Sequence, residues 1–132
     1  MPDLSLDQLV ASMPFAVALG IELDGADKDA VRGRMPWAAD RTTLGGSLHG
    51  GALMAFADSL GAVAAFLHLP EGAATTTVSS STTLTRGVGS GVVHGEAVVQ
   101  HAGRRFITVR TDLRDDEGRL VSQTTQTQAV LS

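Results

Sequence analysis

A short segment in the first half of the chain carries the residue types best suited to catalysis. Residues 45–58 read Gly-Gly-Ser-Leu-His-Gly-Gly-Ala-Leu-Met-Ala-Phe-Ala-Asp, with one histidine, two glycine pairs and one carboxylate. A carboxylate buried among Ala, Phe, Leu and Met without a nearby cation is costly and is rarely kept without a use. Asp58 is therefore the leading catalytic candidate. A structural Asp58, hydrogen-bonded to Ser or Thr hydroxyls of the adjacent Thr-rich strand, is the alternative.

The residues before Asp58 offer a second kind of chemistry. Gly50 and Gly51 stand where a helix is expected to begin, and backbone N–H groups there lack partners within the helix and lie at its positive end. Because glycine has no side chain, a ligand oxygen can approach this backbone, as in an oxyanion hole; a tight turn alone is the alternative. His49 either caps the helix, orients a substrate carbonyl or fills a polar corner.

The spacing of these groups predicts an oligomer. Gly50 and Asp58 are eight residues apart, which is about 12 Å along one helix. Groups that hold one carbonyl from opposite sides lie only about 6 Å apart, so one subunit cannot supply both. Two helices packed antiparallel about a two-fold axis would bring the start of one helix beside the third turn of the other. The chemistry therefore requires a homodimer with two composite sites.

The element that positions these groups is a long apolar helix, expected over residues 49–68. Near the start of the chain, residues 4–13 also have helical spacing, with Asp3 or Ser5 able to cap them, and this helix is expected to end at Pro14. Alternating apolar and polar residues, the pattern of strands, follow elsewhere. The expected strands span residues 18–24, 30–37, 75–86, 91–101, 105–114 and 119–131.

These elements predict an α+β fold. After the long helix the period of two continues to the end of the chain, as in an antiparallel meander, with Gly87, Gly89 and Gly91 forming a hairpin turn. A helix that is apolar on nearly every face must be wrapped. We therefore expect a curved antiparallel sheet around one long central helix, with the remaining helix surface covered by another subunit. Residues 1–132 fit a single domain.

Composition and charge argue against several partners. The formal net charge is −4, tyrosine is absent and only five aromatic rings are present, so nucleic acid has neither a basic surface nor stacking platforms to bind. The most apolar stretch, around the long helix, contains Asp58 near its middle, which argues against a membrane span. We expect a protein that binds neither nucleic acid nor membrane.

The absence of cysteine and of other motifs narrows the chemistry further. Without cysteine there is no disulfide, thiolate nucleophile or Cys-based metal site. The histidines and carboxylates show no metal-ligand spacing, and no dinucleotide or phosphate-loop motif is present, so no metal or cofactor is expected. The first twelve residues lack the basic start and apolar core of a signal peptide. We expect a cytoplasmic location.

A pattern spread over nearly the whole chain resembles a known family. Residues 46–51 read Gly-Ser-Leu-His-Gly-Gly, Asp58 follows the histidine by nine positions, and Gly-Arg-Arg at 103–105 and Asp-Glu-Gly-Arg-Leu-Val at 116–121 come after a Thr-rich strand. This pattern resembles the hotdog-fold acyl-CoA thioesterases, particularly the phenylacetate-degradation type. The resemblance implies a hotdog fold, dimers that usually pair into tetramers, and hydrolysis of an acyl-CoA to a free acid and coenzyme A.

The resemblance also implies roles for individual residues. Asp58 would be the general base or nucleophile, Gly50 the oxyanion donor, and His49 would position the thioester. Thr77 matches the Ser or Thr that stands beside the carboxylate in such enzymes and holds the attacking water. Arginine suits the phosphates of coenzyme A. The expected substrate-binding residues are Gly51, Arg86, Arg104, Arg105 and Thr43, the last standing where close relatives often have Asn.

Two other functions compete with the thioesterase. A non-catalytic acyl-CoA binding subunit would bind the ligand without turnover. A hydratase or dehydratase of the same fold would act on an enoyl-CoA, with the histidine and the acid working on one Cα–Cβ pair. Turnover of a panel of short, medium, long and aromatic acyl-CoA thioesters distinguishes hydrolysis from binding alone, and a test for hydration of an enoyl-CoA distinguishes it from the hydratase.

Overall fold

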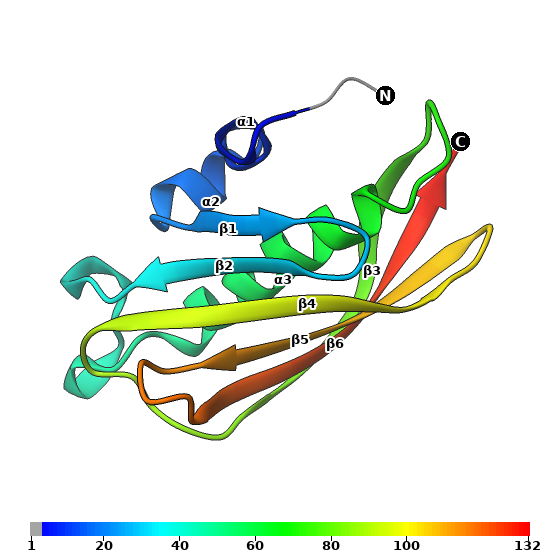
Figure 1. Ribbon diagram of the computed structural model, residues 1–132. Coiled ribbons are helices and arrows are strands. Elements are labelled where there is room, and N and C mark those ends of the chain that lie inside the picture. Colours follow the sequence, from blue (N-terminus) through cyan, green and yellow to red (C-terminus); the bar gives the residue numbers. More distant parts are fainter. Residues whose placement is uncertain (1–3) are drawn as a thin grey trace.

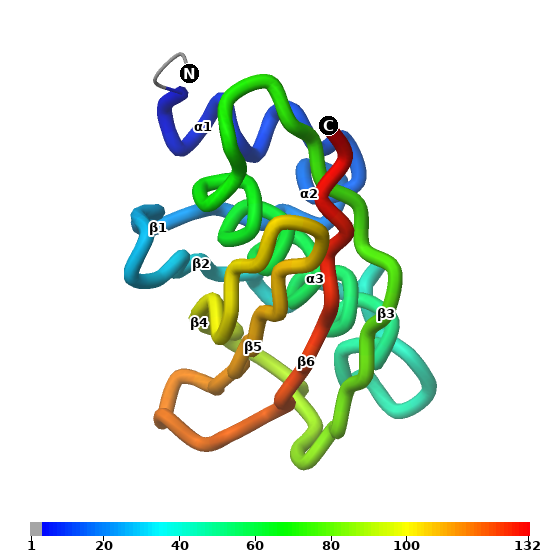
Figure 2. The backbone as a smooth tube through the Cα atoms, turned by 90° about the vertical axis from the view of Figure 1, so that its right-hand side faces the viewer, coloured from blue at the N-terminus to red at the C-terminus, as the bar shows by residue number. Residues whose placement is uncertain are grey.

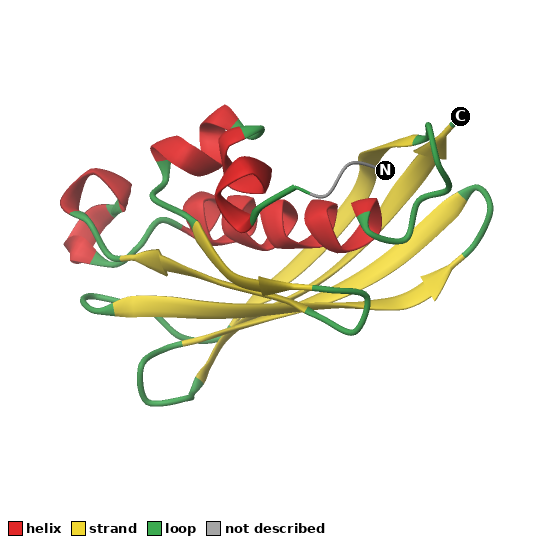
Figure 3. Cartoon of the chain, turned by 45° about the horizontal axis from the view of Figure 1, so that its top comes forward, coloured by secondary structure: helices red, strands yellow, loops and turns green. Residues whose placement is uncertain are grey.

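In the computed structural model, which describes residues 4–132, six strands form one antiparallel sheet that curves around a long helix, α3 (Gly50–Phe66) (Figures 1 and 3). The strands are β1 (Glu22–Ala26), β2 (Val31–Pro36), β3 (Ala74–Leu84), β4 (Val92–Ala102), β5 (Phe106–Arg114) and β6 (Leu120–Leu131). They lie in the order β1-β2-β4-β5-β6-β3. Figure 2 shows α3 enclosed by the sheet, with β1 on one side and β3 on the other. The predicted curved sheet and central helix are confirmed.

One side chain of α3 packs into a space that two glycines of the sheet leave open. Gly33 of β2 and Gly95 of β4 are paired in register. A Cβ atom at Gly95 would lie 2.4 Å from Leu60 Cδ1, and one at Gly33 would lie 2.9 Å from Leu60 Cδ2. The side chain of Leu60 therefore fills the gap, and its burial contributes roughly 1.5–3 kcal/mol. This contact fixes α3, and with it Asp58, against the sheet.

No helix within residues 4–132, α3 included, has the length and apolar character needed to cross a membrane.

The chain begins with a short capped helix, α1 (Leu6–Ala11). Ser5 and Gln8 form a capping box, in which the Ser5 hydroxyl oxygen accepts the Gln8 N–H at 3.1 Å and the Gln8 side-chain oxygen accepts the Ser5 N–H at 2.8 Å. The predicted cap at Ser5 is therefore confirmed, whereas the alternative, Asp3, lies outside the described residues. α1 packs beside β1.

A second short helix, α2 (Pro14–Ala18), is missing from the sequence prediction, which ends a helix at Pro14 and places a strand from residue 18. Pro14 instead starts a helix, because at the first helical position its missing N–H has no partner to lose. Gly20, with a φ of 70°, ends α2 in a Schellman motif, and Ile21 N–H donates to Ala16 O at 3.1 Å. The first strand therefore begins only at Glu22.

The position of β3 differs from the predicted meander. β4, β5 and β6 pair consecutively, but β3 pairs with β6 at the sheet edge. The glycines Gly87, Gly89 and Gly91 therefore do not form a hairpin turn and belong to the connection that crosses from β3 to β4. Val88 in this connection is buried, and its carbonyl accepts the Leu48 N–H at 2.8 Å. The connection thus supports the loop that precedes α3.

A β-bulge in β3 determines which of its side chains face α3. The pairing with β6 shifts register between Thr77 and Ser79, with Val78 as the extra residue, 56% exposed. Thr77 is half-buried before the bulge, and Thr82, five positions later, is half-buried after it. A bulge adds one residue to one strand and so reverses the alternation of its faces. Thr77 is thereby directed towards α3 while the rest of β3 stays paired.

Candidate active site

The first turn of α3 leaves one backbone donor free. His49 is the N-cap, and its carbonyl accepts the N–H of Ala52 at 2.9 Å and of Leu53 at 3.2 Å. Its imidazole Nδ1 accepts the N–H of Gly51 at 2.8 Å. Gly50 N–H donates to no other residue in the range 4–132. Of the glycine pair, only Gly50 presents an unpaired N–H at the positive end of the helix.

Space explains why both positions are glycine. A Cβ atom at Gly51 would lie 2.9 Å from His49 Nδ1, so the absence of a side chain lets the imidazole fold back onto the Gly51 N–H. The structure thus gives this N–H, expected to bind substrate, to the helix cap. A Cβ atom at Gly50 would lie 2.9 Å from Leu84 Cδ1 of β3. Because Nδ1 of His49 accepts a hydrogen bond, the neutral ring carries its proton on Nε2.

The loop before α3 is held by backbone contacts. His49 N–H donates to Arg41 O at 2.8 Å, and the Trp37 indole N–H donates to Gly46 O at 2.9 Å. Thr43 lies in this loop with an exposed side chain, and its N–H donates to Ser47 O at 2.8 Å. Thr43, a predicted substrate-binding residue, is thus on the surface six positions before the helix cap.

Asp58 is half-buried, and its two carboxylate oxygens have different surroundings. Oδ1 accepts the Thr77 hydroxyl at 2.7 Å and the Gln126 side-chain N–H at 2.8 Å. Oδ2 accepts no hydrogen bond from residues 4–132 and is not among the buried polar atoms that lack a partner, so it is accessible. Asp58 lines an open hollow of about 270 Å³ with Met54 and Ser80. The hydroxyl expected beside Asp58 is present, and the surroundings are more polar than the sequence alone indicates.

Two buried glutamines of β6, which the sequence prediction misses, complete these surroundings. Gln126 is 1% exposed and contacts Asp58, while Gln128 is fully buried and donates from its side-chain amide to Thr77 Oγ1 at 2.6 Å. The available signal is the alternation in β6, where every second residue from Ser122 to Gln128 is both polar and buried. Without the pairing of β6 with β3, this signal does not point to Asp58.

The donor at Gly50 and the carboxylate at Asp58 are far apart within one chain. Both belong to α3, eight residues apart, which corresponds to about 12 Å. Gly50 lies beside Leu84 at the end of β3, whereas Asp58 lies beside Thr77 in its first half. The separation expected from the sequence is therefore present.

The three arginines expected at the pocket mouth lie at two opposite ends of the sheet. Arg86 N–H donates to Val121 O at the start of β6, and Arg105 O accepts the Val130 N–H near its end. Nine residues of strand separate these contacts, about 30 Å at the usual rise. Arg104 is next to Arg105 in the turn between β4 and β5, and all three side chains are exposed. Within one subunit they do not converge.

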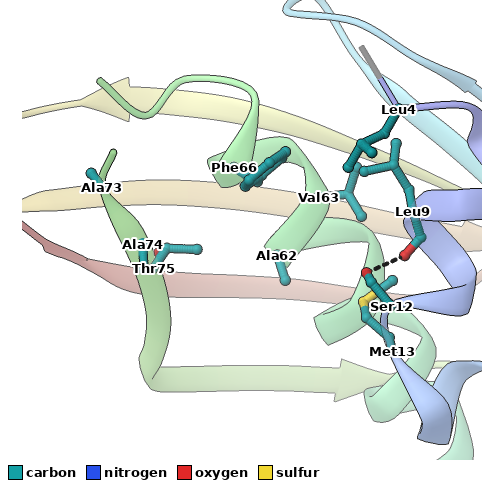
Figure 4. A pocket seen from close by; sticks show the side chains of 10 residues that line it. All are labelled: Leu4, Leu9, Ser12, Met13, Ala62, Val63, Phe66, Ala73, Ala74 and Thr75. Atoms are coloured by element: carbon teal, nitrogen blue, oxygen red, sulfur yellow. Dashed lines mark hydrogen bonds between the residues drawn. The ribbon is translucent and has the colours of Figure 1, made fainter. Parts of the chain in front are cut away.

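An apolar cavity of about 400 Å³ lies next to Asp58 along α3 (Figure 4). Ala62 and Phe66, four and eight positions after Asp58, line it from the same face of α3, and Thr75 lines it from β3, two positions before Thr77. Figure 4 shows side chains of α1 and of the residues just before and after it on the opposite side. Those residues are Leu4, Leu9, Ser12 and Met13.

The side chains around Asp58 are hydroxyl and amide groups of β3 and β6. Within residues 4–132 no group of three His, Asp or Glu side chains lies close enough to hold a metal ion. The candidate donors near Asp58 are hydroxyl and amide groups, which are already bonded to one another. The arrangement favours carbonyl polarisation and acid–base or nucleophilic chemistry by one carboxylate.

Comparison with known proteins identifies the family to which the fold and sequence correspond. Residues 45–122 match the family model described as the Thioesterase superfamily. Over 118 residues the chain is 30% identical to Rv1847 of Mycobacterium tuberculosis, covering 87% of this chain and 84% of that protein. Over 101 residues it is 34% identical to the proofreading thioesterase EntH of Klebsiella pneumoniae, covering 76% and 74%. The crystal structure of thioesterase HI1161 from Haemophilus influenzae matches with a TM-score of 0.92 and 28% identity, covering 99% of this chain and 93% of that chain.

Proposed function

Since the chain belongs to the thioesterase superfamily, we propose that it hydrolyses an acyl-CoA thioester to a free acid and coenzyme A. The chain has the hotdog fold and is a thioester hydrolase. The observation that carries the proposal is the Asp58 carboxylate, which has one oxygen held by Thr77 and the other accessible. It lies on the same helix as the unpaired Gly50 N–H.

The proposed catalytic site is composite and requires a homodimer. One carbonyl cannot contact Gly50 and Asp58 of the same chain across about 12 Å, so Asp58 of the partner subunit would face Gly50. Support comes from the outer face of α3, whose small side chains allow a second helix to approach closely. The residues of this face, exposed or half-buried at helical spacing, are Gly51, Met54, Ala55, Asp58, Ser59 and Ala62. We expect such dimers to pair into a homotetramer.

In this site the Gly50 N–H would polarise the thioester carbonyl, and His49 Nε2–H, beside it, would position the thioester. Two routes then fit Oδ2 of Asp58. As a general base, it takes a proton from a water whose oxygen attacks the carbonyl carbon, and then returns that proton to the departing sulfur. As a nucleophile, it attacks the carbonyl carbon and expels the thiolate, leaving an anhydride that water hydrolyses. Single turnover in ¹⁸O-labelled water distinguishes them, because only the anhydride route can place label in Asp58.

The same dimer explains how three distant arginines could meet one coenzyme A. Arg86 lies at the Gly50 end of its own chain, while Arg104 and Arg105 lie at the opposite end of β6. In an antiparallel pair of α3 helices, the opposite end of one chain lies beside the Gly50 end of the other. Arg86 and Arg104–Arg105 of the partner subunit would then converge on the phosphates. The acyl group would occupy the apolar cavity next to Asp58.

Replacement of Asp58 by asparagine tests the function. The Asp58→Asn variant keeps the shape of the side chain and an acceptor oxygen, but it has neither a base nor a nucleophile. We expect kcat to fall by about 10²–10⁴-fold on a panel of short, medium, long and aromatic acyl-CoA substrates, measured as free thiol released. Asp29→Asn, which neutralises an exposed carboxylate of the β1–β2 turn, is the matched control. A folded, dimeric Asp58→Asn protein with wild-type activity would refute the mechanism.

A further inference from the structure

We propose that Gln126 is a positioning residue, which holds the Asp58 carboxylate in one orientation and so selects Oδ2 as the reacting oxygen. Gln128 assists by orienting Thr77, the other residue that donates to Asp58. This inference rests on the proposed role of Asp58. Gln126 comes from β6, 68 positions later in the chain, and is 1% exposed, so it cannot touch a substrate and acts only through Asp58.

The direction of each hydrogen bond follows from the number of protons available. The Gln128 side-chain N–H donates to Thr77 Oγ1 at 2.6 Å, so the single hydroxyl proton of Thr77 is left for Asp58 Oδ1 at 2.7 Å. Gln126 adds a second donor to the same oxygen at 2.8 Å. A carboxylate oxygen can only accept, so Thr77 must donate to Asp58, and the Gln128 amide must therefore turn its N–H towards Thr77. Both donors that reach the Asp58 carboxylate, the Thr77 hydroxyl and the Gln126 amide, therefore bond to Oδ1.

This assignment gives Thr77 a different task from holding water. With its proton committed to Asp58 and one lone pair occupied by Gln128, the Thr77 hydroxyl orients the carboxylate. Oδ2 receives no donor from the described part of the chain, so its lone pairs are free to meet the attacking water or the thioester carbon. A carboxylate free to rotate would present either oxygen in several orientations, and only some of these allow reaction. Holding the carboxylate in one orientation removes the entropic cost of reaching the productive geometry.

The packing around Gln126 indicates that the amide is retained for activity. Its side-chain oxygen is buried and has no hydrogen-bond partner within residues 4–132, which costs stability. That oxygen also occupies the space beside Gly61 of α3, where a Cβ atom would lie 1.7 Å from it. An apolar side chain of similar length would fill this space without an unpaired acceptor. The polar residue therefore carries a stability cost that the contact with Asp58 explains.

The decisive experiment compares Gln126→Met with Thr124→Val in the full-length protein. Gln126→Met keeps the length of the side chain but removes its donor. Thr124→Val removes a buried hydroxyl of the same strand, which bonds to Thr82 at 2.7 Å and not to Asp58. We expect Gln126→Met to lower kcat about ten- to a hundredfold with KM changed less than about twofold, the range expected for loss of a hydrogen bond to a charged group. Thr124→Val keeps the wild-type kcat.

A double-variant cycle separates positioning from a purely structural role. If Gln126 acts through Asp58, Gln126→Met has no further effect on the residual activity of Asp58→Asn. Wild-type kcat in Gln126→Met, or losses that multiply in the double variant, would overturn the inference while leaving the proposed function intact. Wild-type activity in Asp58→Asn alone would overturn the proposed function instead.

Gly61→Ala provides an independent route if Gln126→Met fails to fold. The added methyl group displaces only the end of the Gln126 side chain. Alanine also favours a helix more than glycine does, and this preference changes the equilibrium constant for folding by about tenfold or less. We expect a folded protein whose kcat falls as in Gln126→Met. A wild-type kcat in Gly61→Ala would contradict the positioning role.

Discussion

The two oxygens of Asp58 have different surroundings, because Oδ1 accepts two hydrogen bonds and Oδ2 accepts none from residues 4–132. Thr77 lies on the next strand in sequence, so a hydroxyl beside the carboxylate could be expected from the Thr-rich pattern alone. Gln126 could not, because its strand reaches Asp58 only through the β6–β3 pairing at the sheet edge. Residues of local origin were thus predictable, and the partner contributed by distant pairing was not.

The role of Gly50 leads to a prediction about a single backbone proton. Proline is well tolerated at the first position of a helix, and the extended backbone of His49, with a ψ of 135°, suits the residue before a proline. Gly50→Pro therefore removes the proposed oxyanion donor while α3 still forms. We expect kcat to fall by about 10²–10³-fold, measured as thiol released from an acyl-CoA.

Gly50→Ala is the matched control for this variant. It places the same Cβ atom near Leu84, where the contact would be 2.9 Å, but keeps the N–H. The difference in kcat between the two variants thus isolates the donor from the added bulk. Equal activities would show that the Gly50 N–H takes no part in the reaction.

At the scale of elements, the sequence predicted the long helix and all six strands because their periodicities are strong and continuous. It missed α2 because five residues are too few to show a period, although Pro14 and Gly20 are a start and a stop signal for a helix. It also placed β3 wrongly, since alternation reveals a strand but not its neighbour. Local sequence patterns predict the helices and strands, whereas contacts between residues far apart in the chain determine how these elements are arranged.

The β1–β2 turn leads to a prediction about pH. Asp27 Oδ1 accepts the N–H of Ala30 at 3.1 Å and of Asp29 at 2.8 Å, and these bonds, that from Ala30 first, hold the pKa of Asp27 below its ordinary value of 3.8. Its contribution to stability is therefore complete above 3.8 and is lost as pH falls through the lower pKa of the folded state.

Asp27→Ala should accordingly destabilise the protein at neutral pH, by an amount that shrinks as the pH is lowered below 3.8. Urea unfolding curves of the two proteins, recorded from about pH 7 down to about pH 3, measure this difference. A difference that stays constant over the whole range would show that the ionised form is not the one the turn stabilises.

At the scale of the whole molecule, the composite site predicts complementation between two inactive variants. Asp58→Asn retains Gly50, and Gly50→Pro retains Asp58. A dimer with one chain of each kind therefore has one intact site and one with both defects. When the two proteins are unfolded together in equal amounts and refolded, half of the dimers are mixed, so about a quarter of wild-type activity should return. Either variant refolded alone is the control, and mixtures without recovery would place both groups in one chain.

The edge position of β3 has a consequence for the order of folding. In the described sheet β3 hydrogen-bonds to β6 alone, and the contacts that orient the carboxylate join residues 51 and 68 positions apart. Contacts across such long loops form late, because the entropy of closing the loop must be overcome first. A newly made chain can thus build most of its sheet before β3 pairs with β6 and the Asp58 carboxylate is oriented. Thioester hydrolysis by this protein would then report on completed folding.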